Sequence, residues 1–176
     1  MIGEESLVLV YDREVKIYKN TRALPRAFVV HDFEVVPDPE TILAKMKAHD
    51  FDPRRTVILE KDPGFPKGRA APGNSTARIV SYRDRSVDVD VEMAADGFLV
   101  LSDAYYPGWA VSVDGQATEL YRADYLLRAV RVPAGHHSVL FRYAPMSFRV
   151  GASVSAASGL FAFGLLRLGR RNRRSV

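Results

Sequence analysis

The chain has 176 residues and no cysteine, so it is long enough for one domain with its own core, and disulfides and thiolate metal sites are excluded. Its formal charge of +4 comes from the carboxyl end, because five arginines stand within 167–176 while residues 1–166 carry 20 basic and 21 acidic side chains. Because this body has no excess positive charge, a nucleic-acid-binding role loses its main support, and we predict no nucleic-acid partner.

The first half of the chain predicts strands separated by loops. Residues 14–18 and 26–36 are rich in β-branched and aromatic side chains, which favours two strands. Residues 56–60 predict a short buried strand. The segment 62–76 that follows contains three prolines and three glycines, and we expect it to form a flexible loop.

One short helix is predicted near 39–49. Asp38 suits the N-cap position, Pro39 the first helical position, and Glu40 the first turn. We expect the helix to bury an apolar face made of Ile42, Leu43 and Met46.

Residues 86–93, SVDVDVEM, alternate between apolar and acidic side chains, which predicts a strand with one buried and one solvated face. Its three acids lie about 6.5 Å apart along the strand, a spacing that favours a solvated face over a calcium site.

Further strands are predicted over 98–102, 109–113 and 116–121, with Asp114 and Gly115 as a hairpin turn between the last two. Strands over 126–132 and 137–143 are expected to pair through a turn that ends at Gly135. Many short strands with close turns predict a mainly β domain over 1–149, an antiparallel, jelly-roll-like β-sandwich.

The carboxyl end predicts a transmembrane helix over 150–168 and a basic tail over 169–176. Residues 150–166 carry no charge and would span roughly 25 Å as a helix. The alternative is a buried helix of a soluble protein. Gly151, Ser155 and Gly159 recur at four-residue spacing, either by chance or as a small-residue strip for packing against other transmembrane helices.

The positive-inside rule then places the tail in the cytoplasm and the β domain outside a bacterial cell membrane. The acidic amino terminus, with an apolar run of only four residues, is not a secretory signal. We therefore expect export to depend on further transmembrane helices of the same or a partner protein.

The stretch SDAYYPGWAVSVDG, residues 102–115, gathers Tyr105, Tyr106 and the single tryptophan, Trp109. With Gly108 completing a turn, Trp109 is expected to be buried and structural. The alternative is a sugar platform formed by Tyr105 or Tyr106, with Arg122 and Asp124 as hydrogen-bonding partners. We predict that this stretch has mainly a structural role and that one of its edges is the candidate for ligand binding.

No catalytic residue, metal site or cofactor site is predicted. The chain shows no phosphate-binding loop, nucleophile elbow or zinc spacing. Two of its four histidines, His136 and His137, are adjacent in a predicted strand, so their side chains diverge.

Four segments resemble the carboxyl-terminal part of the YfhO family of polytopic bacterial membrane proteins: VKIYKNTRALPRAFVV (15–30), DAYYPGWAVSVDG (103–115), YRADYLLRAVRVPAGHHSVLFRYAP (121–145) and SFRVG (147–151). The resemblance implies a parent similar to glycosyltransferases that use lipid-linked sugars. It also implies an extracytoplasmic β-rich domain before a last transmembrane helix. It transfers no catalytic residue to this chain.

Three functions follow as hypotheses. The first is a non-catalytic extracytoplasmic domain of a membrane glycosyltransferase-type protein that modifies a cell-surface polymer. The others are a carbohydrate-binding module that contacts a cell-surface glycan and an adaptor that binds protein at the membrane surface.

Overall fold

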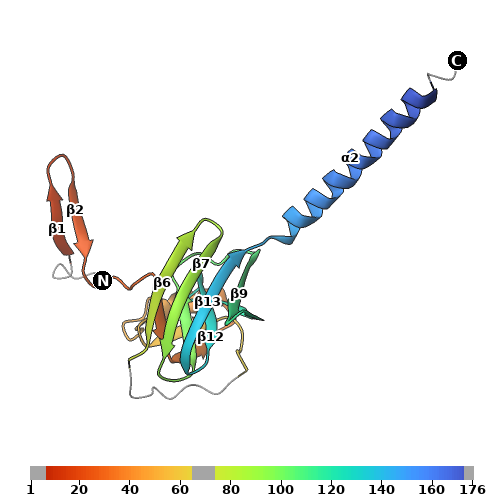
Figure 1. Ribbon diagram of the computed structural model, residues 1–176. Helices are drawn as coiled ribbons and strands as arrows, with labels where there is room; N and C mark the ends of the chain where they lie inside the picture. Colours follow the sequence, from red (N-terminus) through yellow and green to blue (C-terminus); the bar gives the residue numbers. More distant parts are fainter. Residues whose placement is uncertain (1–6, 65–73, 173–176) are drawn as a thin grey trace.

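The computed structural model describes residues 7–64 and 74–172 (Figure 1). It confirms a mainly β chain with antiparallel-rich sheets and one short helix. Two sheets pack together, and a separate two-stranded hairpin and a long carboxyl-terminal helix project away from them in Figure 1. Most of the predicted loop 62–76 lies outside the described residues, as do residues 173–176 of the predicted tail.

The first sheet has five antiparallel strands. In spatial order these are β10 (Gln116–Thr118), β9 (Trp109–Val113), β13 (Gly135–Tyr143), β7 (Ser86–Met93) and β6 (Thr76–Arg83). The alternation predicted for 86–93 is confirmed, since Val87, Val89, Val91 and Met93 are all buried.

The second sheet has six strands. In spatial order these are β3 (Ala27–Val30), β8 (Gly97–Leu101), β12 (Leu127–Val132), β11 (Leu120–Ala123), β5 (Thr56–Leu59) and β4 (Asp32–Val35). The single strand predicted over 26–36 is therefore wrong, because the chain breaks at His31 into β3 and β4. These two strands lie at opposite ends of the strand order, and one residue spans less than about 4 Å. The two edges of the sheet consequently meet at His31, and the sheet curls around a core of its own.

Strand β8 shows how this curling creates two cores. Leu99 and Leu101 point into the core between the two sheets, whereas Phe98 and Val100 point into the core inside the curled sheet. The Phe98 ring makes edge contacts with the rings of Phe33 and Tyr121, at centroid distances of 5.6 and 5.8 Å. All five β8 residues are thus buried, which a simple sandwich with one solvated face per sheet does not allow.

Helix α1 (Pro39–Met46) connects β4 to β5, which pair in parallel. The predicted cap is confirmed, since the Asp38 carboxylate accepts a hydrogen bond from the Thr41 amide at 2.8 Å. The helix is shorter than the predicted 39–49, and only part of its apolar face is buried: Ile42 is inaccessible, whereas Leu43 is 37% exposed. This parallel crossover also departs from the all-antiparallel jelly-roll expectation.

One predicted strand and one predicted pairing are wrong because the chain passes from one sheet to the other. The segment 116–121 splits at Glu119 into β10 of the first sheet and β11 of the second. Likewise β12 and β13 do not pair with each other: β12 lies between β8 and β11, and β13 between β7 and β9. Gly135 does adopt a positive φ of 121°, but it serves a crossing between sheets.

The predicted Asp114–Gly115 turn is confirmed as the link between β9 and β10. Both residues have positive φ, 51° and 78°, the geometry in which a two-residue hairpin matches strand twist. The Asp114 carboxylate holds the turn by accepting from the Ser138 amide at 2.9 Å and by contacting the His137 ring at 2.6 Å.

The amino-terminal hairpin consists of β1 (Leu7–Asp12) and β2 (Lys16–Asn20). The strand predicted over 14–18 therefore starts later, and β1 was not predicted. Apolar side chains are exposed on both faces of the hairpin, among them Leu9 paired with Tyr18 and Tyr11 paired with Ile17.

Helix α2 (Met146–Asn172) contains the uncharged segment near the carboxyl end. Among the described residues, no helix combines the length and the apolar character needed to cross a bilayer, so the transmembrane helix predicted over 150–168 is not supported. A side chain at Gly151 or Gly159 would meet no atom within 4 Å. Packing of the strip formed by Gly151, Ser155 and Gly159 against another helix stays a prediction.

Candidate functional site

The predicted aromatic stretch forms the loop between β8 and β9, and it is held at several points. The Tyr105 amide donates to the Leu126 carbonyl at 2.6 Å, and the Gly108 carbonyl accepts from the Ala144 amide at 2.7 Å. Gly108 has a φ of 102°, and a Cβ there would lie 2.9 Å from the Tyr143 ring, so glycine is required.

Trp109 begins β9 and is half-buried at the edge of the core between the sheets. Its ring lies 5.5 Å from the Tyr143 ring, and the Arg128 guanidinium carbon lies 3.7 Å from its centroid. The structural role expected for Trp109 is consistent with these contacts, although its side chain is not fully buried.

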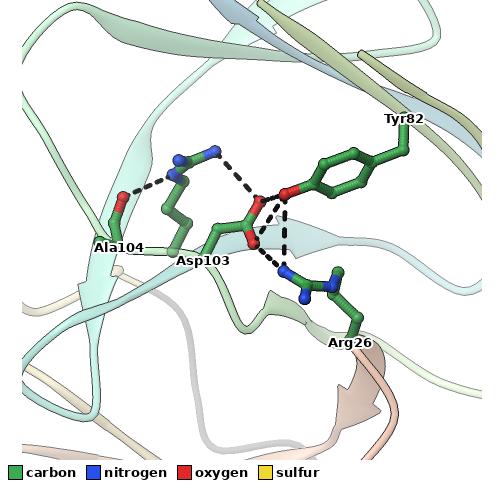
Figure 2. Close-up of polar contacts among 5 residues, drawn as sticks. Arg26, Tyr82, Asp103 and Ala104 are labelled. Carbon is green, nitrogen blue, oxygen red and sulfur yellow. Dashed lines mark hydrogen bonds and ion pairs between the residues drawn. The ribbon is translucent and has the colours of Figure 1, made fainter. Parts of the chain in front are cut away.

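Asp103 lies at the centre of a polar cluster that joins the two sheets, which we name the Asp103 cluster: Arg26, Tyr82, Asp103 and Arg128 (Figure 2). The Arg26 guanidinium contacts the Asp103 carboxylate at 2.7 Å, and the Tyr82 hydroxyl donates to it at 2.9 Å. Tyr82 belongs to β6 and Arg128 to β12, so the cluster connects the first sheet to the second.

Arg128 is the buried member of this cluster, with a side chain only 6% exposed. Its Nε donates to the Ala104 carbonyl at 2.9 Å, and its Nη1 lies 3.8 Å from the Asp103 carboxylate. Burial lowers the pKa of the Arg128 guanidinium. Nη1 is buried without a hydrogen bond among the described residues, so its charge is balanced by Asp103 and the Trp109 ring.

The sequence analysis did not identify the Asp103 cluster. A usable signal was present: in the pattern LRAVRV, Arg128 has the same parity as Val130 and Val132, whose side chains are in the core between the sheets. A charged residue on the core face of a strand indicates a buried ionic contact.

A groove of about 210 Å³ opens where β5 and β11 separate. One register pair, Ala123 with Leu59, joins these strands. Beyond it, the residues that follow β5 diverge from β11. The groove is lined by Glu60, Lys61, Tyr105, Glu119, Tyr121 and Arg122.

Two ion pairs cross this groove from one wall to the other. The Lys61 ammonium lies 2.5 Å from the Glu119 carboxylate, and the Arg122 guanidinium lies 3.3 Å from that of Glu60. The hydrogen bond from Lys61 lowers the pKa of Glu119. The Arg122 guanidinium carbon is also 5.1 Å from the centroid of the Tyr105 ring.

The structure brings together two of the four residues proposed from sequence for ligand binding, Tyr105 and Arg122. Tyr106 is 62% exposed and does not line the groove. Asp124 is 4% exposed and faces the backbone instead, its carboxylate accepting from the Ile58 amide at 2.9 Å. The Ile58 amide would otherwise need a ladder partner, so Asp124 stabilises the point where the strands separate.

Burial raises the pKa of Asp124 to about 6, although the hydrogen bond from Ile58 opposes the shift. Between about pH 4 and pH 6, Asp124 is therefore protonated in the native state but ionised in the unfolded state. Native stability from this group falls as pH rises through that window, by about 3 kcal/mol in total.

Asp124→Asn should remove this dependence while keeping an acceptor oxygen for Ile58. From about pH 4.5 to pH 8 we expect the free energy of unfolding of the variant to gain about 2 kcal/mol relative to the parent, because part of the titration lies below pH 4.5. Urea unfolding across this range measures the difference. A difference that stays constant with pH would contradict a titrating Asp124.

A larger cavity of about 500 Å³ lies beside His31, between the start of β4 and the loop before β5. Its lining includes three aspartates, two arginines and His31, and no Phe, Tyr or Trp ring. Within 7–64 and 74–172, no three His, Cys, Asp or Glu side chains are placed to hold a metal ion. The smaller groove at Tyr105 is the stronger candidate site, because it combines a ring with both donors and acceptors.

Comparison with known proteins confirms the resemblance to the YfhO family. The family model described as bacterial membrane protein YfhO matches residues 61–155, which include the Asp103–Arg128 pair and the groove-lining residues named above except Glu60. A protein of Bacillus subtilis (strain 168), described as uncharacterized protein YfhO, is 25% identical over 134 residues, which cover 75% of this chain. The chain spans about 15% of the length of that relative. No solved structure matches. The family match covers more than half of the sequence, and the chain belongs to the YfhO family of bacterial membrane proteins.

Proposed function

We propose that this chain is a non-catalytic domain that holds a saccharide for a bacterial membrane protein of the glycosyltransferase type, which modifies a cell-surface polymer. In this proposal the β-sheet domain lies outside the cytoplasm. The groove then contacts one sugar unit of the donor or of the acceptor polymer.

The observation that carries this proposal is the juxtaposition of Tyr105 and Arg122 in the groove. Sugar rings present apolar faces that pack on aromatic rings and hydroxyls that both donate and accept hydrogen bonds. Tyr105 supplies such a ring, while Glu119 and Arg122 supply acceptors and donors. The volume of about 210 Å³ is below the roughly 300–1,000 Å³ of pockets that enclose a drug-sized ligand, which suits a single unit of a longer glycan.

The ionised state of the two carboxylates in the groove supports a binding role and not a catalytic one. Enzymatic cleavage of a glycosidic bond commonly needs a carboxylic acid whose pKa is raised, so that it can donate a proton. Lys61 instead lowers the pKa of Glu119, and Glu60 pairs with Arg122. Both carboxylates of the groove are thus engaged by cations, which favours a positioning role.

Titration of the full chain with cell-wall oligosaccharides tests the proposal. We expect Tyr105→Ala and Arg122→Ala each to weaken binding at least tenfold, about 1.4 kcal/mol. Arg131→Ala is the matched control, because Arg131 forms an exposed ion pair with Asp96 outside the groove. Binding that is absent in the parent chain, or equal in all variants, would contradict the proposed function.

The proposed orientation can be tested with a single introduced thiol, because the chain contains no cysteine. Tyr106→Cys places the thiol on a side chain that is 62% exposed. In intact cells that produce the full-length family protein with this residue replaced and no other accessible thiol, we expect labelling by a membrane-impermeant maleimide. Labelling only after lysis would place the domain in the cytoplasm.

A further inference from the structure

The charges of the groove balance within the groove itself. Glu60 and Glu119 contribute two negative charges, and Lys61 and Arg122 contribute two positive charges. All four charged side chains line the groove, so a ligand that enters it lies near both ion pairs.

We infer, on the basis of the proposed function, that the groove selects an uncharged saccharide unit over one that carries a carboxylate or a phosphate. A hydroxyl group can bind here without breaking either ion pair. Glu119 accepts from Lys61 through one oxygen and from Tyr121 through the other at 3.1 Å, and each oxygen has a second lone pair. Lys61 has three N–H donors and Arg122 has five, of which the ion pairs use only part.

An anionic saccharide unit is repelled by the carboxylates of the groove. To contact Lys61 or Arg122 it must lie beside Glu119 or Glu60, whose charge repels it, or displace that carboxylate from its cation. The Glu119 side chain is 46% exposed and that of Glu60 is 28% exposed, so solvent weakens this repulsion at the first pair more than at the second. The discrimination therefore depends on both carboxylates remaining ionised and in place.

Glu119→Gln tests the inference by leaving Lys61 without its counter-charge. Chitotetraose serves as the uncharged probe and a tetragalacturonate oligomer as the anionic probe, both titrated into the full chain by calorimetry. We expect the parent to bind chitotetraose in preference. In the variant, the ratio of the affinity for the galacturonate oligomer to that for chitotetraose should rise about tenfold, and galacturonate binding should become sensitive to salt.

Glu34→Gln is the matched control. Glu34 pairs with Lys45 at 2.6 Å outside the groove, and both side chains are exposed to a similar degree as Glu119. This variant adds the same positive charge to the protein, so it should leave both affinities unchanged. Glu60→Gln, which releases Arg122, provides a second test should Glu119→Gln fold poorly.

The outcomes separate this inference from the function on which it rests. If the parent binds the galacturonate oligomer as tightly as chitotetraose, the inference is wrong and the proposed function stands. If Glu34→Gln strengthens anion binding as much as Glu119→Gln, overall charge rather than the groove decides, and the inference is again wrong. If neither probe binds the parent, both the inference and the proposed function are overturned.

Discussion

Asp103→Ala is expected to lower the free energy of unfolding by roughly 3–5 kcal/mol, because it leaves a buried cation without its partner. The Arg128 side chain is only 6% exposed, and its Nη1 already lacks a hydrogen bond among the described residues. Loss of Asp103 also removes the hydrogen bonds that the Tyr82 hydroxyl donates, so that Tyr82 keeps only its 3.5 Å contact with Arg26 within the cluster. Urea unfolding followed by far-UV circular dichroism measures the change.

Two variants separate the buried contact from the exposed one. The side chain of Arg26, one partner of Asp103, is 56% exposed. We therefore expect Arg26→Ala to lower the free energy of unfolding by at most about 1 kcal/mol. In the double variant Asp103→Ala, Arg128→Met, no charge remains buried in the Asp103 cluster, so most of the lost stability should return. If the double variant is no more stable than Asp103→Ala, an unpaired Arg128 is not the cause.

Trp109→Ala is expected to cost about 3 kcal/mol, the lower end for a tryptophan truncation, because the ring is half-buried. The substitution removes contacts with Tyr143 and with the core residues beneath β9. It also uncovers the guanidinium of Arg128, which lies 3.7 Å from the ring centroid. Because both Asp103 and Trp109 contact Arg128, their effects should not add independently.

This variant needs a readout other than intrinsic tryptophan fluorescence, since Trp109 is the only tryptophan. Circular dichroism serves instead, with Tyr106→Ala as control; the Tyr106 side chain is 62% exposed, and we expect a change within about 0.5 kcal/mol. A Trp109→Ala chain of unchanged stability that no longer binds saccharide would make Trp109 a ligand platform and reject its structural role.

The candidate site was only partly accessible to sequence reasoning. Tyr105 and Arg122 stood out as an aromatic and a charged residue near turns, and the structure places them together. Asp124 looked equally suitable, yet its backbone has a positive φ of 46° and its carboxylate turns inward to Ile58. Whether a polar side chain near a turn faces solvent or the backbone depends on the neighbouring strand, which local sequence does not specify.

Features that depend on a few adjacent residues could be predicted from the sequence. The Asp38 cap, the Asp114–Gly115 turn and the alternating burial of β7 all follow from local hydrogen bonding, backbone preference and side-chain period. The sheet that each strand joins could not be predicted from the sequence and follows from the folded chain. The chain changes sheet at Glu119 and between β12 and β13, and it turns a continuous apolar run into two strands at His31. The alternation of apolar and polar residues in a strand indicates which side chains are buried, but it does not indicate which strand packs against them. Strand pairing and the formation of the groove depend on contacts between residues far apart in the chain. The energies of these contacts cannot be inferred from local sequence patterns.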